Sequence, residues 1–144
     1  MQPLKLVALD EQDLAIVSAH VQDAVMKVGD ISWAPGEKRL LLTMNRFAWE
    51  KKTQLFSNAH ERRRAVLHFD RVTHVKSVGI DRARPDDVLS LLAIRHTAGD
   101  PPAARIELDF AGGATLLLDV ECVEVRLTDL GAAWQAAAKP RHGA

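Results

Sequence analysis

Behind Asp10, apolar residues recur at three- and four-residue spacing, the pattern of a helix with one buried face. Asp10 can cap the first turn of such a helix, and Asp13 stands where a capping box places an acidic residue. Gly29 offers a stop at the far end. We therefore predict an N-terminal helix whose buried stripe consists of Leu14, Val17, Val21, Val25 and Val28.

Beyond residue 30 the apolar positions alternate with polar ones, as in strands with one buried face. Pro35-Gly36 suits the centre of a type II turn, because proline presets φ and glycine accepts a positive φ. Ala111-Gly112-Gly113 lies between two such runs and is typical of a hairpin. We predict about seven or eight antiparallel strands, within residues 31–33, 39–47, 65–69, 72–80, 88–97, 106–110, 114–120 and 122–127.

Near the end of the chain, Thr128 and Asp129 can cap a second helix, because their side-chain oxygens suit the free amides of a first turn. An alanine-rich run follows as far as Ala138, and Pro140 cannot continue a helix. We therefore predict a short C-terminal helix that ends by Ala138.

These elements predict one domain over residues 1–138 and a flexible tail over residues 139–144. The fold class is β-rich α+β: an antiparallel curved sheet or partly open barrel, with the N-terminal and C-terminal helices covering its core. The strand count is similar to that of a pleckstrin-homology-type barrel, by analogy alone. Residues 65–70 and 114–119 also resemble each other, so a pair of related meanders is the alternative architecture.

The composition is that of a soluble globular protein, with 47% apolar and 26% charged residues in 144. Nineteen Lys and Arg balance nineteen Asp and Glu, which argues against a protein whose whole surface binds nucleic acid or acidic lipid. The single cysteine, Cys122, excludes an internal disulfide and a thiolate-rich metal site. Neither a secretory leader nor an apolar run long enough for a membrane span is visible, so we expect a cytoplasmic protein without a membrane partner.

The charges are unevenly distributed along the chain. Residues 51–76 hold seven basic and two acidic side chains, whereas residues 107–129 hold six acidic and one basic. If the two segments are neighbours in the sheet, their charges oppose one another across strands. If they lie apart, the molecule has a basic face and an acidic face, through which it can bind a charged partner or its own copies.

No established catalytic or nucleotide-binding motif occurs in the sequence. The remaining candidates for chemistry are His68, Asp70 and His74, which would share a face if residues 66–76 formed one unbroken strand. Asp70 could then orient His68 for hydrolytic or metal-dependent chemistry. However, Asp70-Arg71 looks like a bend, and an extended strand would separate the two histidines by about 20 Å. We therefore favour surface histidines, no cofactor and no enzymatic function.

A second alternative is single-stranded nucleic-acid binding through the segment 47–64, which interleaves aromatic and basic side chains. Bases stack on aromatic rings while cations follow the phosphates. The candidate binding residues are Trp49, Lys51, Lys52, Phe56, Arg62, Arg63 and Arg64. The simpler interpretation is that Phe47 and Trp49 pack inward while the cations are solvated.

The chain resembles a known family at residues 28–33 (VGDISW), 45–50 (NRFAWE), 67–72 (LHFDRV) and 118–131 (LDVEC through LTDLG). It is similar to short single-domain proteins of alphaproteobacteria that are grouped as domain of unknown function 2948. The resemblance covers nearly the whole chain. It implies a bacterial cytoplasmic protein and brings no activity, ligand or site residue with it.

From the residues themselves we expect a non-enzymatic binding or assembly module that acts through its charged faces and a sheet edge. Its partner would be another protein or a second copy of the chain. Nucleic-acid binding and a hydrolytic or metal-dependent activity are the two alternatives.

Overall fold

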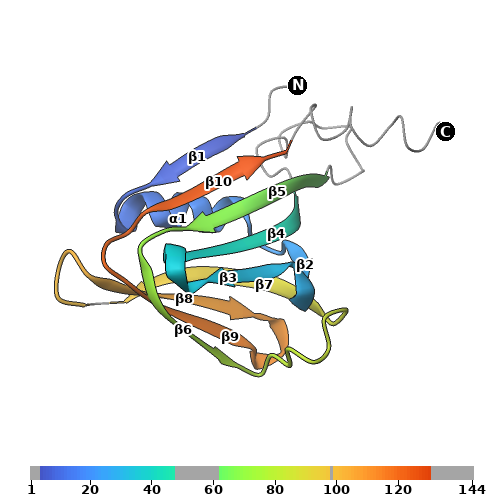
Figure 1. Cartoon of the computed structure of the whole chain (residues 1–144). Helices are drawn as coiled ribbons and strands as arrows, with labels where there is room; N and C mark the ends of the chain where they lie inside the picture. Colours follow the sequence, from blue (N-terminus) through green and yellow to red (C-terminus); the bar gives the residue numbers. More distant parts are fainter. Residues whose placement is uncertain (1–3, 48–61, 98, 131–144) are drawn as a thin grey trace.

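The computed structural model describes residues 4–47, 62–97 and 99–130 (Figure 1). Within these residues it contains one α-helix, ten β-strands and short 3₁₀ turns. The helix and strands are β1 Lys5–Ala8, α1 Glu11–His20, β2 Val25–Lys27, β3 Ile31–Ala34, β4 Arg39–Phe47, β5 Arg62–Phe69, β6 Val72–Val78, β7 Val88–Thr97, β8 Ala104–Phe110, β9 Thr115–Val120 and β10 Val125–Asp129. The 3₁₀ turns are η1 Val28–Asp30, η2 Pro35–Glu37 and η4 Ala111–Gly113.

The strands form one antiparallel sheet in the order β1-β10-β5-β4-β2-β7-β8-β9-β6, with β3 paired to β4 outside this path. The sheet curves but does not close into a barrel, and α1 packs against β1 and β7 (Figure 1). The predicted β-rich antiparallel fold is therefore confirmed. The described part of the chain has no helix with the length and apolar character that a bilayer crossing needs.

One two-stranded ribbon joins the two ends of the sheet. β5 pairs with β10, and β6, which follows β5 directly, pairs with β9. Pairing continues across the bend, because the Asp70 N–H donates to the Glu124 carbonyl (3.0 Å) and the Glu121 N–H donates to the Arg71 carbonyl (2.9 Å). Arg71 has a left-handed φ of 62°, which turns the strand. The predicted bend at Asp70-Arg71 is thus confirmed, and both strands of the ribbon bend together (Figure 1).

This ribbon also explains the uneven charge. The described part of the basic segment 51–76 lies on β5 and β6, and the acidic segment 107–129 includes β9 and β10. Because β5 pairs with β10 and β6 with β9, the two segments are neighbours in the sheet. Opposite charges of the two segments meet at the bend, where Arg71 Nε lies 3.8 Å from Glu124 Oε1 and Arg126 Nη2 lies 3.2 Å from Asp70 Oδ2. The basic residues that open β5 pair instead with residues of β4.

The N-terminal end of α1 agrees with the prediction from the sequence. The Asp13 N–H donates to the Asp10 side chain (2.7 Å), so Asp10 is the N-cap. The first part of the predicted stripe is buried against the sheet, namely Leu14, Val17 and Val21.

The predicted end of this helix is wrong, because α1 stops at His20. Asp23 adopts a left-handed φ of 64°, and its N–H donates to the Leu91 carbonyl of β7 (2.7 Å). The chain therefore joins the sheet instead of continuing the helix. Val25 begins β2 and Val28 begins η1, although both residues continue the helical spacing of apolar positions.

Two smaller predictions are also corrected. The turn at Pro35-Gly36 is the 3₁₀ turn η2. Lys38, the residue that follows this turn, adopts a positive φ of 53°, whereas Gly36 does not adopt one. Cys122 precedes β10, which begins only at Val125, because the bend of the ribbon occupies the residues between.

The predicted C-terminal helix does not begin where expected. Thr128 and Asp129, expected as its caps, are the last residues of β10, because they pair with β5. Residues 131–138, which would form this helix, and the predicted tail 139–144 lie outside the described residues.

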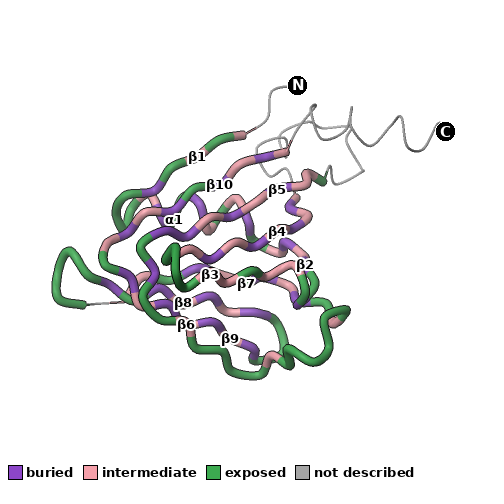
Figure 2. The backbone as a smooth tube through the Cα atoms, in the orientation of Figure 1, coloured by how far each residue is buried: buried purple, intermediate pink, exposed green. Residues whose placement is uncertain are grey.

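The core lies inside the curve of the sheet, and buried residues alternate with more exposed ones along most of the strands (Figure 2). On the two central long strands the inward residues are fully buried. They are Leu40, Leu42 and Met44 on β4 and Ala65, Leu67 and Phe69 on β5.

Arg46 continues the inward series of β4, so a charged side chain lies where an apolar one would be expected. It is completely buried and meets the equally buried Asp129 of β10. The Arg46 Nε and Nη2 atoms donate to the Asp129 Oδ1 and Oδ2 atoms, both at 2.8 Å. The Leu4 N–H donates to the same carboxylate (3.0 Å), so this ion pair holds β4, β10 and the residue before β1 together.

We predict that Arg46→Met lowers the free energy of unfolding by about 3–5 kcal/mol, because it leaves the Asp129 charge buried without its bidentate partner. The matched control is Arg95→Met, which removes an exposed arginine paired with Asp109 and should cost less than about 1 kcal/mol. Urea unfolding followed by circular dichroism measures both. Equal losses in the two variants would contradict a special role for the buried pair.

Candidate functional site

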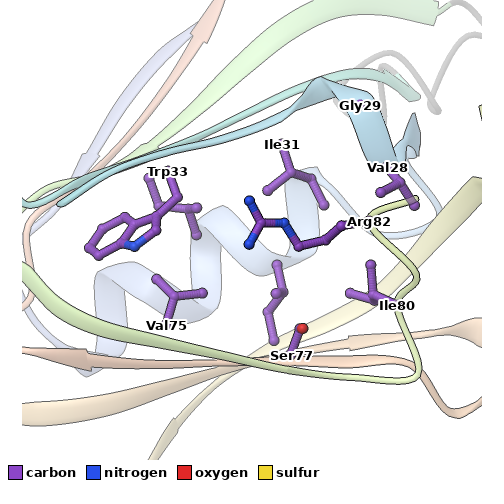
Figure 3. Close-up of a pocket in the computed structure, with 10 residues that line it drawn as sticks. Val28, Gly29, Ile31, Trp33, Val75, Ser77, Ile80 and Arg82 are labelled. Atoms are coloured by element: carbon purple, nitrogen blue, oxygen red, sulfur yellow. The ribbon is translucent and has the colours of Figure 1, made fainter. Parts of the chain in front are cut away.

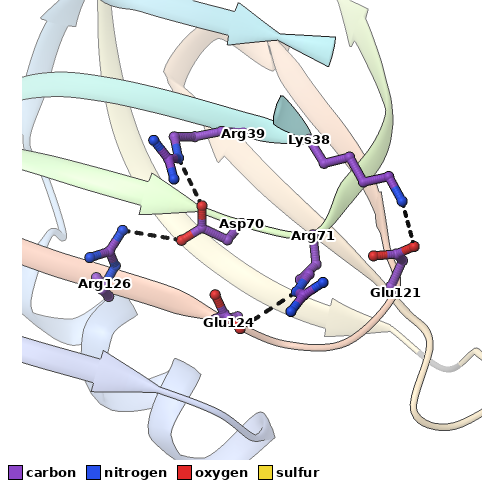
Figure 4. Close-up of polar contacts among 7 residues, drawn as sticks. All are labelled: Lys38, Arg39, Asp70, Arg71, Glu121, Glu124 and Arg126. Atoms are coloured by element: carbon purple, nitrogen blue, oxygen red, sulfur yellow. Dashed lines mark hydrogen bonds and ion pairs between the residues drawn. The ribbon is translucent and has the colours of Figure 1, made fainter. Parts of the chain in front are cut away.

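Two places in the described part of the molecule combine polar and apolar groups in a way that suits binding. The first is a group of seven charged side chains around the bend of the ribbon, which we call the kink cluster (Figure 4). Its members are Lys38, Arg39, Asp70, Arg71, Glu121, Glu124 and Arg126. The second is a pocket between β3 and β6, which we call the seam pocket.

Asp70 lies at the centre of the kink cluster, with 11% of its side chain exposed. Arg39 Nε donates to its Oδ1 atom (2.9 Å), and Arg126 Nη2 donates to its Oδ2 atom (3.2 Å). Burial by itself would raise the pKa of Asp70, but the hydrogen bond and charge of Arg39, together with Arg126, outweigh it and hold that pKa below its ordinary value. Asp70 therefore ties β4 and β10 to the end of β5.

The outer pairs of the kink cluster are exposed. Lys38 Nζ lies 2.7 Å from Glu121 Oε2, and this hydrogen bond lowers the pKa of Glu121. Arg71 Nε lies 3.8 Å from Glu124 Oε1. Lys38 and Arg71 both have left-handed backbones, which cost about 1–2 kcal/mol per residue outside glycine. The backbone contacts of the bend hold them there, including the Val72 N–H that donates to the Lys38 carbonyl (2.9 Å).

A shallow hollow of about 540 Å³ connects the kink cluster to the edge strand β1. Val7 of β1 and Leu9, the next residue but one, line it, with 57% and 63% of their surfaces exposed. Among the residues described here, β1 pairs only with β10, so its outer edge has no strand partner. The hollow thus joins exposed apolar side chains, charges of both signs and a free sheet edge.

We predict that Asp70→Asn destabilises the fold by about 1 kcal/mol at neutral pH, a modest loss because its two arginines are themselves exposed. Since the folded pKa of Asp70 is lowered, its contribution is complete above the unfolded pKa near 4 and is lost as the pH falls through the folded pKa. The difference from the wild-type protein should therefore shrink below about pH 4. Urea unfolding at neutral and acidic pH measures it.

The control for this prediction is Asp86→Asn, which neutralises an exposed aspartate paired with Lys27 at 3.7 Å and should be nearly neutral in stability. A wild-type advantage over Asp70→Asn that stays constant down to acidic pH would contradict the assignment of Asp70.

The structure does not bring His68, Asp70 and His74 together as a site for chemistry. His68 lies on β5 and His74 on β6, on opposite sides of the bend. Asp70 forms hydrogen bonds with Arg39 and Arg126, and none with His68 or His74. Burial, followed by the charge of Arg126, lowers the pKa of His68. No group of three or more metal-binding side chains occurs among the described residues.

Four of the seven residues predicted to bind nucleic acid lie outside the described residues, namely Trp49, Lys51, Lys52 and Phe56. The other three open β5. The Arg62 guanidinium lies 5.3 Å from the centre of the Phe47 ring, and Arg64 Nη1 donates to Asn45 Oδ1 (3.3 Å). Arg63 alternates with them along the strand and is partly buried. Nucleic-acid binding therefore stays a prediction.

The seam pocket has a volume of about 270 Å³ and lies between β3 and β6 (Figure 3). β3 pairs only with β4, and β6 only with β9, so within the described chain each strand turns an unpaired edge toward this side. The walls are mostly apolar, and one side chain that lines the pocket, Arg82, is charged. The lining residues are Val28, Gly29, Ile31, Trp33, Leu40, Val75, Ser77, Ile80, Arg82 and Leu116.

The β6–β7 loop, residues 79–87, forms one side of the seam pocket and is fixed to η1. The Gly29 N–H donates to the Pro85 carbonyl (2.8 Å), and the Val28 N–H donates to the Asp87 carbonyl (2.9 Å). A Cβ atom at Gly29 would lie 3.1 Å from Pro85 Cβ and 3.2 Å from the Pro85 carbonyl oxygen. A side chain at position 29 would therefore require the loop to shift by a few tenths of an ångström.

We predict that Gly29→Ala destabilises the fold by about 1 kcal/mol, because the added methyl group pushes the loop away from η1. Gly36→Ala is the matched control: nothing lies within 4 Å of its Cβ position, so it should be neutral or gain up to about 1 kcal/mol. Urea unfolding gives both values, and hydrogen exchange at the Gly29 amide should accelerate only in the first variant. Equal stability of the two variants would show that the loop does not need the close contact.

The seam pocket was not foreseen in the sequence. Gly29 was interpreted as the end of a helix, and Trp33 as one residue of a short strand. The residues of the seam pocket become neighbours only through the pairing of β6 with β9 and of β3 with β4. No motif of adjacent residues could have indicated it.

The fold and these two sites define a β-rich protein with open strand edges, an apolar seam pocket and a charged bend. The family model described as "Protein of unknown function (DUF2948)" matches residues 4–142, and the chain belongs to this family. The resemblance noted in the sequence is thereby confirmed. Comparison with curated proteins and with solved structures finds no significant match.

Proposed function

We propose that this protein is a non-enzymatic binding module of the bacterial cytoplasm that docks an extended segment of a partner protein beside β1. The observation that carries the proposal is the outer edge of β1, which has no strand partner among the described residues and lies next to the exposed Val7 and Leu9 and the kink cluster. Exposed sheet edges accept an additional strand through main-chain hydrogen bonds.

The register of β1 supports this mode of binding. The Asp129 N–H donates to the Leu4 carbonyl (2.9 Å), and hydrogen-bonded pairs alternate along an antiparallel ladder. The backbone groups of Leu6 and Ala8 therefore form hydrogen bonds with β10. The backbone N–H and C=O groups of Lys5 and Val7 point away from β10. These outward groups are the ones that an added strand would bond.

The kink cluster would give the partner its orientation. Its exposed ion pairs are weak in water, so side chains of a partner can replace them at little cost. Because the cluster holds both signs of charge, we expect a partner segment with acidic and basic side chains on either side of an apolar one. Binding should weaken as salt rises.

The size of the edge favours a peptide segment over a second copy of the chain. β1 has four residues and is about 14 Å long. A stable dimer buries roughly 800 Å² on each subunit, which a symmetric pairing of two such strands does not supply. A short extended segment needs only the edge and the adjacent hollow.

The test is affinity capture from lysate with three baits: the wild-type protein, Val7→Lys and Val88→Lys. Val88 is the matched control, since this exposed valine (66%) lies on β7, away from the β1 edge. A lysine at position 7 places a charge on the edge and the hollow. We expect the wild-type protein and Val88→Lys to retain the same protein at low salt, and Val7→Lys to lose at least about 90% of it.

Equal capture by all three baits would refute docking at β1. Sedimentation of the purified protein at low salt provides a second readout. If the wild-type protein sediments as a dimer and Val7→Lys as a monomer, the occupant of the β1 edge is a second copy of the chain and not a segment of a partner protein. Retention of nucleic acid by the wild-type bait, unaffected by Val7→Lys, would favour the nucleic-acid alternative instead.

A further inference from the structure

The seam pocket leaves large apolar side chains incompletely covered. Ile31, Trp33, Val75 and Ile80 pack against the core but are only partly buried. In a closed barrel a strand between β3 and β6 would cover them, but here the sheet stays open at this place. A ligand with an apolar body would remove their remaining surface from water, which is the main source of affinity in small pockets.

Arg82 supplies a charge at the mouth of the seam pocket. Figure 3 shows its guanidinium reaching from the β6–β7 loop into the space between Ile31 and Ser77. In the part of the chain that the structure describes, Arg82 has no hydrogen bond and no ion pair. An arginine aimed over apolar walls without an acidic partner is well placed to bind an anion.

The neighbours of Arg82 in the same loop are all engaged. Asp81 accepts the Ala83 N–H (2.9 Å), and Asp86 lies 3.7 Å from Lys27 Nζ. Arg84 Nε lies 3.3 Å from Asp87 Oδ1. These contacts, with the close packing of Gly29 on Pro85, hold the loop in place, and the exposed Arg82 side chain lines the pocket.

The other polar groups of the seam pocket agree with an anionic ligand. Among the described residues, no acidic side chain lines the pocket. Ser77 contributes a hydroxyl group to the pocket. Trp33 lies at the end of the pocket opposite the β6–β7 loop, and its indole N–H has no hydrogen-bond partner among the described residues. With one cation and apolar walls, the site suits a singly charged carboxylate better than a phosphate, which is usually bound by several donors together.

We propose that the seam pocket binds a small monocarboxylic acid with an apolar body, whose carboxylate pairs with Arg82. The volume of about 270 Å³ is just below the usual range for ligand sites. It therefore fits a medium-chain or aromatic acid and not a larger lipid. The site is separate from the β1 edge, so the proposal does not depend on the proposed function.

The test uses octanoate as the probe and isothermal titration calorimetry as the measurement. We expect the wild-type protein to bind octanoate with a Kd of about 0.1 mM and octanamide, which lacks the charge, at least about tenfold more weakly. In Arg82→Gln the preference for octanoate over octanamide should disappear. The matched control is Arg84→Gln, which removes an arginine of the same loop that is not a lining residue and should keep the preference.

The location is checked by amide chemical-shift changes, which should concentrate in β3 and the β6–β7 loop. Failure of the wild-type protein to bind octanoate at about 5 mM would overturn the proposal. So would an unchanged preference for octanoate in Arg82→Gln, or shift changes confined to β1. Val7→Lys should leave octanoate binding intact, which separates this test from that of the β1 edge.

Discussion

The shared bend of the β5–β6 and β9–β10 ribbon is the constraint on which the rest of this molecule depends. Both strands turn at the same place, and backbone hydrogen bonds on each side of the bend connect the β5–β10 pairing to the β6–β9 pairing, with a register shift between Val72 and His74. Beyond the bend, β6 and β9 diverge from β4 and from β3, which pairs with it. In the part of the chain that the structure describes, this divergence leaves the facing edges of β3 and β6 unpaired and so creates the seam pocket.

The same bend accounts for the kink cluster. Where two paired strands bend sharply, part of the backbone is exposed to water. The side chains at such a bend must be able to contact both water and the neighbouring strands. Asp70 meets that need, since its two oxygens bind arginines from the strands on each side of β5. Part of the charge asymmetry of the sequence therefore serves this bend, through Arg71 and Glu124. The outer pairs of the kink cluster remain exposed.

Local features of the fold could be predicted from the sequence. The alternation of β4, the cap at Asp10 and the bend at Asp70-Arg71 each depend on residues close together in the chain. The end of α1 could not, because Val25 and Val28 keep the helical spacing while a contact with Leu91, more than sixty residues away, decides their structure. Thr128 and Asp129 were misassigned for the same reason, since their strand partners lie on β5.

The sites were harder to predict than the strands. The hypothesis that the protein binds through a sheet edge required only that the chain form a sheet. The role proposed for Arg82 depends on which arginine of the β6–β7 loop has no ion-pair partner among the described residues. Arg46 makes the same point, because it stands beside aromatic and basic residues that suggested a nucleic-acid surface. Its buried partner, Asp129, lies 83 positions further along the chain. Local composition cannot distinguish such a buried cation from a solvated one.

The pairing of β1 with β10 has a consequence for biosynthesis. A chain emerges from the ribosome N-terminus first, yet residues 5–8 pair with residues 125–128, and Leu4 bonds Asp129. β1 can therefore pair only after the residues of β10 have been translated. During that interval the nascent β1 has no native neighbour strand, and a chaperone that binds short apolar segments would meet residues 4–9 before the sheet does.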